Sequence, residues 1–306
     1  MTAIVKILRR AIASRTASSD GFIVVAVLWM LGALATLASI YAVYVVNTAT
    51  SMGVNDDRLQ SEGLVAAALE VTAYGLTADD KNVPAHGNFA FRLGRAAVAV
   101  EFTAETGRID LNSAPKGLLA GLFAGLGAAY PDAEYYADRI VGWRTGQDPD
   151  KPNDEASLYR TSGLGYGPRQ APFGHVGELS LVLGLPPVLI ERAMPFVTVF
   201  SGRAEINVLA AAPEVIAALP GMTPQRLYAV LSQRGSGPQN AQFLEAVLGP
   251  DHPGVTTESG KATRVAVRID LNNRARVRAE AVILLQGDGK EPFRVLSWRD
   301  DFDGPS

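Results

Sequence analysis

The sequence predicts an α+β fold in which a long N-terminal helix packs on an antiparallel sheet, with a large helical domain inserted between the strands. Three observations predict it. An uncharged apolar run lies near the N-terminus, strand patterns occur before residue 112 and after residue 263, and short helical segments fill the interval. Neither strand group alone makes a well-sized sheet, so we expect the two to share one.

The composition excludes several kinds of site. The chain has 306 residues, enough for one large or two modest domains, and it has no Cys, which excludes disulfides, thiolate zinc sites and cysteine nucleophiles. With 28 Lys and Arg against 31 Asp and Glu, the net charge of -3 provides no basic field for nucleic acid. The sequence contains no hydrolase elbow, zincin helix or phosphate loop, so we expect a protein that is not an enzyme.

The N-terminal apolar run is long enough to cross a bilayer. Phe22 to Val46 is a stretch of 25 residues that spans roughly 37 Å as a helix. The residues before it carry four positive charges and one negative charge: Lys6, Arg9, Arg10, Arg15 and Asp20. The positive-inside rule then places the N-terminus in the cytoplasm and the rest of the chain outside it. A cleaved secretory signal is the alternative, although the run exceeds an ordinary signal core.

The helix is expected to continue past the membrane as a spine for the sheet. Within Asp56 to Ala78, the residues Leu64, Ala68 and Val71 recur at helical spacing. The expected division of the chain is 1–21 for a leader, 22–78 for the transmembrane and spine helix, 79–112 with 263–306 for the sheet domain, and 113–262 for the inserted helical domain.

Strand patterns flank the helical insertion. Phe89 to Phe102 is rich in Val and Phe, and a turn at Glu105–Gly107 is expected to pair it with Arg108–Leu111 in antiparallel fashion. From Thr263 to Trp298, alternating residues and a turn at Gly287–Gly289 predict an antiparallel meander.

The insertion is expected to consist of short helices separated by Gly and Pro. They are Leu118–Leu126, Ala133–Trp143, Val176–Leu183, Pro187–Ala193, Glu214–Leu219 and Pro224–Gln233. Two of these helices follow similar strings, Asn112 to Pro115 and Ile206 to Pro213, in which a polar residue precedes a helix that starts at Pro. The repeated string suggests a duplicated helical unit.

An acidic segment in this insertion is a candidate cation site. Asp148, Asp150, Asp154 and Glu155 lie within eight residues, and such hard oxygen ligands suit calcium better than zinc or magnesium. A solvated polar loop is the competing interpretation, because Pro152 interrupts the ligand spacing and the string does not match an EF-hand.

The string Pro220 to Thr223 after a short helix resembles a helix-hairpin-helix, a motif that binds DNA phosphates. Between Glu205 and Asp251, however, four acidic residues stand against two arginines. Such a segment repels phosphate, so we favour a structural or protein-binding use of this hairpin.

Several short segments, taken in order, resemble the minor pseudopilin K family of the type II secretion system, also called general secretion pathway protein K. The resemblance extends from Gly21 to Trp298. The segments that carry it are the leader junction Ser19-Asp20-Gly21-Phe22 with Val27-Leu28-Trp29, then Arg108 to Asn112, Pro172-Phe173 with Glu178-Leu179, Ile206-Asn207, and Val295 to Trp298. Ala26 also stands where most pilin-like proteins have a Glu, and the lack of this Glu is a feature of the K subunit.

The resemblance implies a type IV pilin-like fold and a leader that prepilin peptidase removes between Gly21 and Phe22, followed by methylation of Phe22. It implies a minor pseudopilin in the bacterial inner membrane, with a periplasmic C-terminal domain, at the tip of the pseudopilus. The implied partners are minor pseudopilins I and J and the major pseudopilin, the implied role is initiation of the fibre that exports folded proteins across the outer membrane, and calcium is the implied ion of the helical domain.

The chain departs from the family pattern in one respect that bears on calcium. Thr145 and Gln147 stand where the family usually has acids after the Trp that corresponds to Trp143, which weakens one calcium site. Asp148 and Glu155 match acidic positions of that segment.

Two other functions compete with the assembly role. One is a membrane-anchored helix-hairpin-helix protein that receives DNA during uptake, which would need a basic hairpin and an uncut anchor. The other is a membrane-tethered periplasmic hydrolase, which would need a nucleophile and base that the spacing does not reveal.

Overall fold

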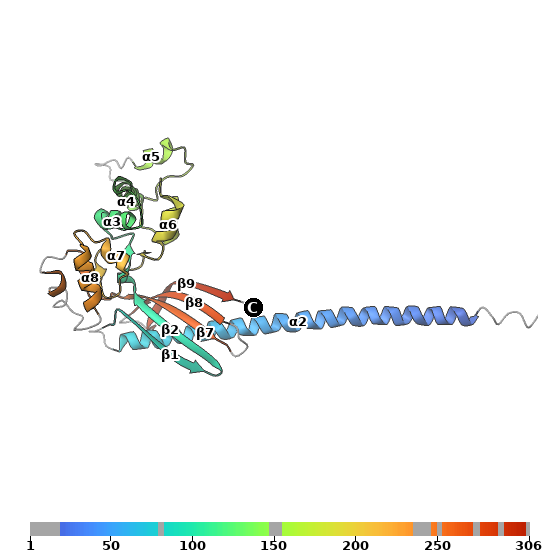
Figure 1. Ribbon diagram of the computed structural model, residues 1–306. Helices are drawn as coiled ribbons and strands as arrows, with labels where there is room; N and C mark the ends of the chain where they lie inside the picture. The colour runs from blue at the N-terminus through green and yellow to red at the C-terminus, as the bar shows by residue number, and fades with distance from the viewer. Residues whose placement is uncertain are drawn as a thin grey trace, which may run out of the picture. The chain divides into compact units, whose positions relative to one another are not determined.

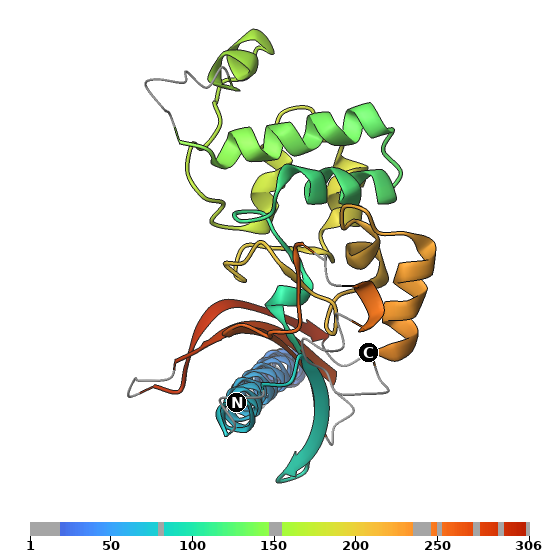
Figure 2. The same ribbon diagram turned by 90° about the vertical axis from the view of Figure 1, so that its left-hand side faces the viewer.

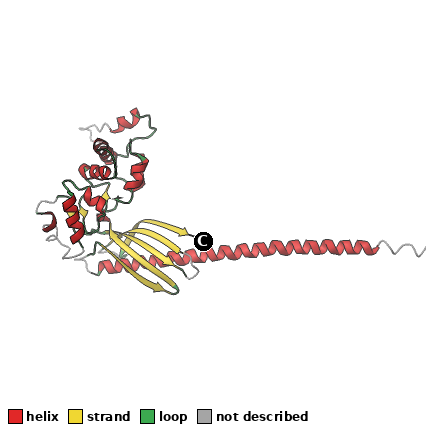
Figure 3. Cartoon of the chain, viewed as in Figure 1, coloured by secondary structure: helices red, strands yellow, loops and turns green. Residues whose placement is uncertain are grey.

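The computed structural model describes residues 19–78, 83–146, 155–234, 246–249, 253–271, 276–286 and 291–303. The chain divides into two compact units, Met1–Glu62 and Gly63–Ser306. The first unit contains most of helix α2, and the second contains the end of α2, a five-stranded sheet and a block of short helices (Figures 1 and 3).

Helix α2 spans Ser19–Thr77 and includes the expected membrane segment. Its stretch Phe22–Thr48 has a mean hydropathy of 2.4 over its best window, and by length and composition it could cross a membrane. Polar residues are tolerated there because their hydroxyls bond to the helix itself: Thr36 donates to the Gly32 carbonyl at 2.8 Å, and Ser39 donates to that of Ala35 at 2.9 Å.

The sheet confirms the expected union of the two strand groups. Its order is β1-β2-β7-β8-β9, with every neighbouring pair antiparallel. The strands are β1 His86–Leu93, β2 Ala96–Ala104, β7 Ala262–Asp270, β8 Arg276–Leu285 and β9 Phe293–Asp303. The join lies between β2 and β7, where Val98 faces Ile269 and Val100 faces Val267.

The expected strand pair around residue 105 is wrong. Residues 86–104 form a hairpin by themselves, because Gly94 adopts a φ of 61°, as the first position of a two-residue turn requires. Glu105–Gly107 is a 3-10 turn, and the following strand β3, Ile109–Asp110, pairs in parallel with β4, Val197–Thr198, inside the helical block.

The last four turns of α2 pack on one face of the sheet, and Figure 2 shows the strands curving over the helix. Alternate residues of β2, β7 and β8 point at the helix because side chains on a strand alternate between the two faces. The buried helix residues are Leu64, Val65, Ala68, Leu69, Thr72, Ala73 and Leu76. Val71, which the helical spacing grouped with Leu64 and Ala68, is not buried with them, because it is 47% exposed on the side of the helix that the sheet does not cover.

The helical block has its own core and lies beyond one end of the strands (Figure 1). Its helices are α3 Lys116–Gly125, α4 Tyr130–Arg144, α5 Glu155–Thr161, α6 Pro187–Ala193, α7 Pro213–Ala217 and α8 Pro224–Gln233. The segment Val176–Leu181 is a 3-10 helix, and the block also contains the short parallel pair of β5, Ile206–Asn207, with β6, Val255–Thr256. The sequence did not predict helix α5, because the acidic residues at its start are typical of a loop.

The repeated string adopts the same geometry twice. The Asp110 carboxylate accepts the amide of Asn112 at 2.7 Å, and the Asn207 side chain accepts that of Leu209 at 3.0 Å. In each copy the carbonyl of the Asp or Asn accepts two further amides, and a helix follows that has Pro at its start. The two helices then touch, since a Cβ on Gly121 of α3 would lie 2.2 Å from the Ala218 carbonyl oxygen.

Replacing Leu69 by Ala tests the packing of α2 on the sheet. Leu69 is 2% exposed in this interface, so Leu69→Ala is expected to lower the free energy of unfolding by about 2–5 kcal/mol. Val71→Ala removes an exposed side chain two residues later on the same helix and serves as the control, with an expected change under about 0.5 kcal/mol. Denaturant unfolding of the purified protein measures both, and equal losses would contradict the assigned helix face.

Candidate assembly surface and buried junction

The expected processing residues lie in the first turn of α2. Gly21 and Phe22 are both helical, and the Phe22 ring is 75% exposed. Large apolar side chains continue to be exposed along the following turns, including Trp29 at 77%. Such exposure is unfavourable in water and favourable in lipid, so this segment requires an apolar environment.

A second exposed surface lies on the side of α2 that the sheet leaves uncovered. We call it the outer stripe, and its members are Gly63, Ala66, Ala67, Glu70, Val71 and Tyr74. Tyr74 is 78% exposed and Val71 is 47% exposed. The small residues at its start let another helix approach the backbone closely, and the two larger residues offer apolar area for a partner.

The sheet and the helical block meet at a buried junction, the turn Glu105–Gly107. Glu105 is 0% exposed and Thr106 is 1% exposed. A Cβ on Gly107 would lie 2.8 Å from that of Ala210, so only glycine fits there. The Thr106 hydroxyl donates to the carbonyl of Ser259 at 3.1 Å, which ties the turn to the segment before β7.

The carboxylate of Glu105 connects the two halves of the second unit. One oxygen pairs with Arg264 Nε of β7 at 2.7 Å, and the other accepts the hydroxyl of Thr198 in the helical block. Arg264 also pairs with Glu280 of β8, which accepts from Arg299 of β9 at 2.6 Å. These hydrogen bonds and ion pairs therefore form a continuous network from Thr198 in the helical block across strands β7, β8 and β9.

The ion pairs shift the titration of Glu280. Burial disfavours its charged form, but Arg264 and Arg299 outweigh that cost and lower the pKa of Glu280 below its ordinary value of 4.5. The same ion pairs stabilise the charged form of Arg264. Burial lowers the pKa of its guanidinium, but Glu105 and Glu280 raise it by more, so the net shift is upward.

Asn112 and Glu178, which belong to two of the motifs that carry the family resemblance, each bind separate segments of the helical block together through hydrogen bonds; we call the contact made by Asn112 the Asn112 clamp. Asn112 accepts the amide of Phe173 at 2.6 Å and donates to its carbonyl at 3.1 Å. Glu178 accepts from the Trp143 indole at 3.3 Å and from the Gly174 amide at 2.9 Å, and it pairs with Arg169 at 2.9 Å. These residues hold the loop after α5 on helix α4.

Three of the four expected calcium ligands, Asp148, Asp150 and Asp154, lie outside the described residues, so their calcium binding stays a prediction. The fourth, Glu155, starts α5 and is 4% exposed. Its Oε2 pairs with Arg139 Nη1 of α4 at 3.0 Å. In the described part of the chain, no group of three His, Asp or Glu is arranged to hold a metal ion.

The hairpin between α7 and α8 uses its own polar groups internally. Gly221 turns the chain with a φ of 74°, and Arg226 donates to its carbonyl at 3.3 Å. The Thr223 hydroxyl caps α8 by accepting the Arg226 amide at 3.3 Å. This arginine therefore stabilises the turn, and the geometry gives no support to phosphate binding.

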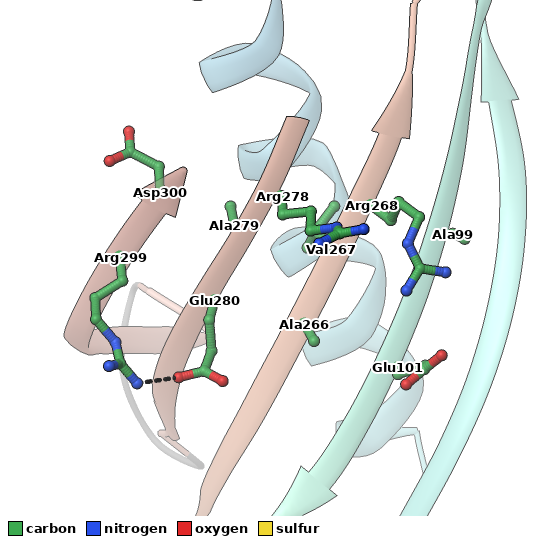
Figure 4. Close-up of a pocket in the computed structure, with 10 residues that line it drawn as sticks. All are labelled: Ala99, Glu101, Ala266, Val267, Arg268, Arg278, Ala279, Glu280, Arg299 and Asp300. Carbon is green, nitrogen blue, oxygen red and sulfur yellow. Dashed lines mark hydrogen bonds and ion pairs between the residues drawn. The ribbon is translucent and has the colours of Figure 1, made fainter. Parts of the chain in front are cut away.

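The sheet face opposite α2 carries a shallow pocket of about 370 Å³. Figure 4 shows Arg268 of β7 and Arg278 of β8 pointing out of the sheet side by side, with Glu280 and Arg299 paired nearby. Arg268 and Arg278 are direct cross-strand neighbours, and Ala99 and Ala266 form the small floor beside them.

Glu105→Gln tests whether the charged junction stabilises the fold. The amide cannot balance the buried guanidinium of Arg264, so the expected loss is about 3–5 kcal/mol in the free energy of unfolding. Glu280→Gln alters a carboxylate that is 33% exposed and should cost about 1 kcal/mol or less. Denaturant unfolding at pH 7 compares the two, and an equal cost would rule out a special role for the buried pair.

The same network predicts a pH dependence. Because the pKa of Glu280 is lower in the folded protein, its contribution to stability is fully present above its unfolded pKa, near 4.5, and is lost as the pH falls through the folded pKa. Between pH 6 and pH 3 the wild type should lose more stability than Glu280→Gln, and parallel curves would contradict this.

Comparisons with known proteins agree with these features. Residues 100–202 match the family model for type II secretion system (T2SS) protein K. The fold is similar to that of a chain in the crystal structure of the GspK-GspI-GspJ complex from the enterotoxigenic Escherichia coli type 2 secretion system. That match has a TM-score of 0.60 and 18% identity, and it covers 82% of this chain and 98% of the other.

No curated protein sequence matches the chain. The family match begins in β2, crosses the junction and ends just after β4. It therefore includes Glu105, the Asn112 clamp and Glu178, the residues to which the geometry gives connecting roles. The resemblance to the minor pseudopilin K family is thus confirmed over residues 100–202, which match the model of type II secretion system protein K, and the whole chain has an α+β fold similar to that of the solved structure.

Proposed function

We propose that this chain is a minor pseudopilin of a type II secretion system, a non-enzymatic assembly subunit of the fibre that exports folded proteins across the outer membrane. The observation that carries the proposal is the protein K family match over residues 100–202. The long apolar helix, the sheet that packs on its end and the attached helical block agree with it.

The apolar segment of α2 anchors the subunit in the bacterial inner membrane. The basic residues ahead of Phe22 keep the N-terminus in the cytoplasm, and the sheet and the helical block then lie in the periplasm. Prepilin peptidase removes residues 1–21 on the cytoplasmic side, and Phe22 becomes the methylated first residue of the mature chain.

The partners are minor pseudopilins I and J and, farther down the fibre, the major pseudopilin. The solved relative comes from a GspK-GspI-GspJ complex, which supports this choice. The outer stripe of α2 is the contact surface, because Val71 and Tyr74 expose apolar area on a helix face that the sheet does not cover.

The subunit occupies the tip of the fibre and initiates its assembly. Ala26 stands at the fifth position after the processing site, where a Glu would pair with the N-terminal amine of a neighbouring subunit. A buried carboxylate in the membrane is costly unless paired, so a first subunit has no use for one. The helical block adds bulk beyond the sheet, which suits an end position better than the interior of a helical fibre.

Tyr74→Lys tests the assembly role in cells. In a strain that lacks the chromosomal gene, the wild-type chain is expected to restore secretion of an exoprotein. Tyr74→Lys should reduce secretion and co-purification of pseudopilins I and J about tenfold or more, because it places a charge in the apolar contact. Val295→Lys, which places the same charge at a partly exposed apolar residue of β9, 42% exposed, is the control and should behave as wild type.

If the deletion leaves secretion intact and instead abolishes DNA uptake, the assembly role is wrong and the DNA-receptor alternative takes its place. If secretion is lost in the deletion but Tyr74→Lys restores it fully, the assembly role stands and the outer stripe is not the contact.

The N-terminus of the chain from membranes tests the processing step. Mass spectrometry is expected to find methylated Phe22 as the first residue in cells that have prepilin peptidase. Gly21→Leu should leave the leader attached, because the bulky side chain replaces the glycine at the cut. An intact leader on the wild-type chain in such cells would contradict the proposal.

A further inference from the structure

Among the described residues of the helical block, the ion pair between Glu155 and Arg139 is the most deeply buried. The two side chains are 3% and 14% exposed, and Glu155 Oε2 lies 3.0 Å from Arg139 Nη1. A carboxylate at this depth needs a positive partner, because removal from water disfavours its charge unless another charge compensates.

Helix α4 is shaped to receive this carboxylate. A Cβ on Gly142 would lie 2.4 Å from Glu155 Oε2 and 2.5 Å from its Cδ, so any other residue at this position would force the carboxylate to move from its place against the helix. Arg139 lies one turn earlier on the same helix, and its guanidinium is also 5.1 Å from the centre of the Tyr135 ring. Helix α4 therefore supplies both the space above Gly142, which we call the notch, and the positive charge of Arg139.

The contact holds α5 in place together with Tyr159. The Tyr159 ring is fully buried beside Trp143, with ring centres 6.0 Å apart, and its hydroxyl accepts the Leu183 amide at 2.8 Å. Glu155 and Tyr159 are one turn apart on α5, so the ion pair and the ring fix the same face of this short helix. The carboxylate thus has a structural use within the described residues.

We infer that the Arg139 guanidinium is the resident cation of Glu155 and that this carboxylate takes no part in calcium binding. A divalent cation at Glu155 would need several oxygen ligands and would lie beside a fixed positive charge that repels it. The expectation that Glu155 joins Asp148, Asp150 and Asp154 as a ligand does not fit this arrangement. The inference concerns Glu155 alone and holds whether or not the other three residues bind calcium.

The test compares the calcium response of two forms of the full chain in detergent. The thermal midpoint is measured for the wild type and for Glu155→Gln, each in excess EGTA and in millimolar calcium. The expected result is the same calcium-induced shift in both forms, of whatever size. A smaller shift in Glu155→Gln would overturn the inference, because it would mean that the carboxylate contributes to the ion's site.

A double-mutant cycle provides an independent readout in EGTA. Arg139→Gln alone should lower the midpoint by about 6–12 °C, because it leaves a buried carboxylate unpaired. In the Glu155→Gln background the same change should cost less than half as much. Equal costs in both backgrounds would mean that the pair does not couple, and the inference would fail.

Arg139→Lys is the matched control, since it keeps the charge and should retain part of the midpoint that Arg139→Gln loses. If Glu155→Gln does not fold alone, the double variant Arg139→Gln/Glu155→Gln replaces it in the calcium comparison, because that variant leaves no unpaired charge. A calcium shift equal to that of the wild type would support the inference, and a smaller shift would overturn it.

Discussion

The arrangement of the second unit depends on one buried carboxylate, that of Glu105. It is 0% exposed, and its two oxygens bond to groups on opposite sides of the junction, Arg264 of the sheet and Thr198 of the helical block. A buried carboxylate tolerates few other positions for its partners, because losing Arg264 leaves its charge uncompensated in a low-dielectric environment and losing Thr198 removes the hydrogen bond to its other oxygen. The pair therefore fixes where the chain leaves β2 and where the helical block begins.

Glycines make the rest of this packing possible. Gly107 lies against Ala210, Gly121 against the Ala218 carbonyl, and Gly142 against the Glu155 carboxylate. Short helices bury little area each, so the block is held together by an apolar core that its helices share and by the close approach of their backbones. The repeated turns at Asp110 and Asn207 set the starts of α3 and α7 so that these two helices meet.

The surfaces that remain free suit a subunit of a larger assembly. The apolar segment Phe22–Thr48 exposes large apolar residues along its length, and the outer stripe exposes Val71 and Tyr74 on the helix face that the sheet does not cover. Internal polar groups are used for structure: Glu178 holds a loop, Arg226 holds a turn and Arg139 holds Glu155. The polar groups named here are bound within the fold, whereas the outer stripe of α2 exposes apolar side chains, and this combination favours a role in assembly.

Patterns that repeat along the sequence were enough to predict the apolar helix, its continuation to Thr77, the union of the two strand groups and most helices of the block, because periodic burial leaves a local record. The same approach failed at the turn Glu105–Gly107, at Val71 and at α5, where the outcome depends on contacts between distant residues. Glu155 shows the difference for the candidate site. Its acidic neighbours suggested a metal ligand, and only the folded chain brings Arg139 and the notch at Gly142 to its carboxylate. The partner of a buried charge is the group that lies nearest to it in the folded protein, and the spacing of residues along the sequence does not reveal that distance.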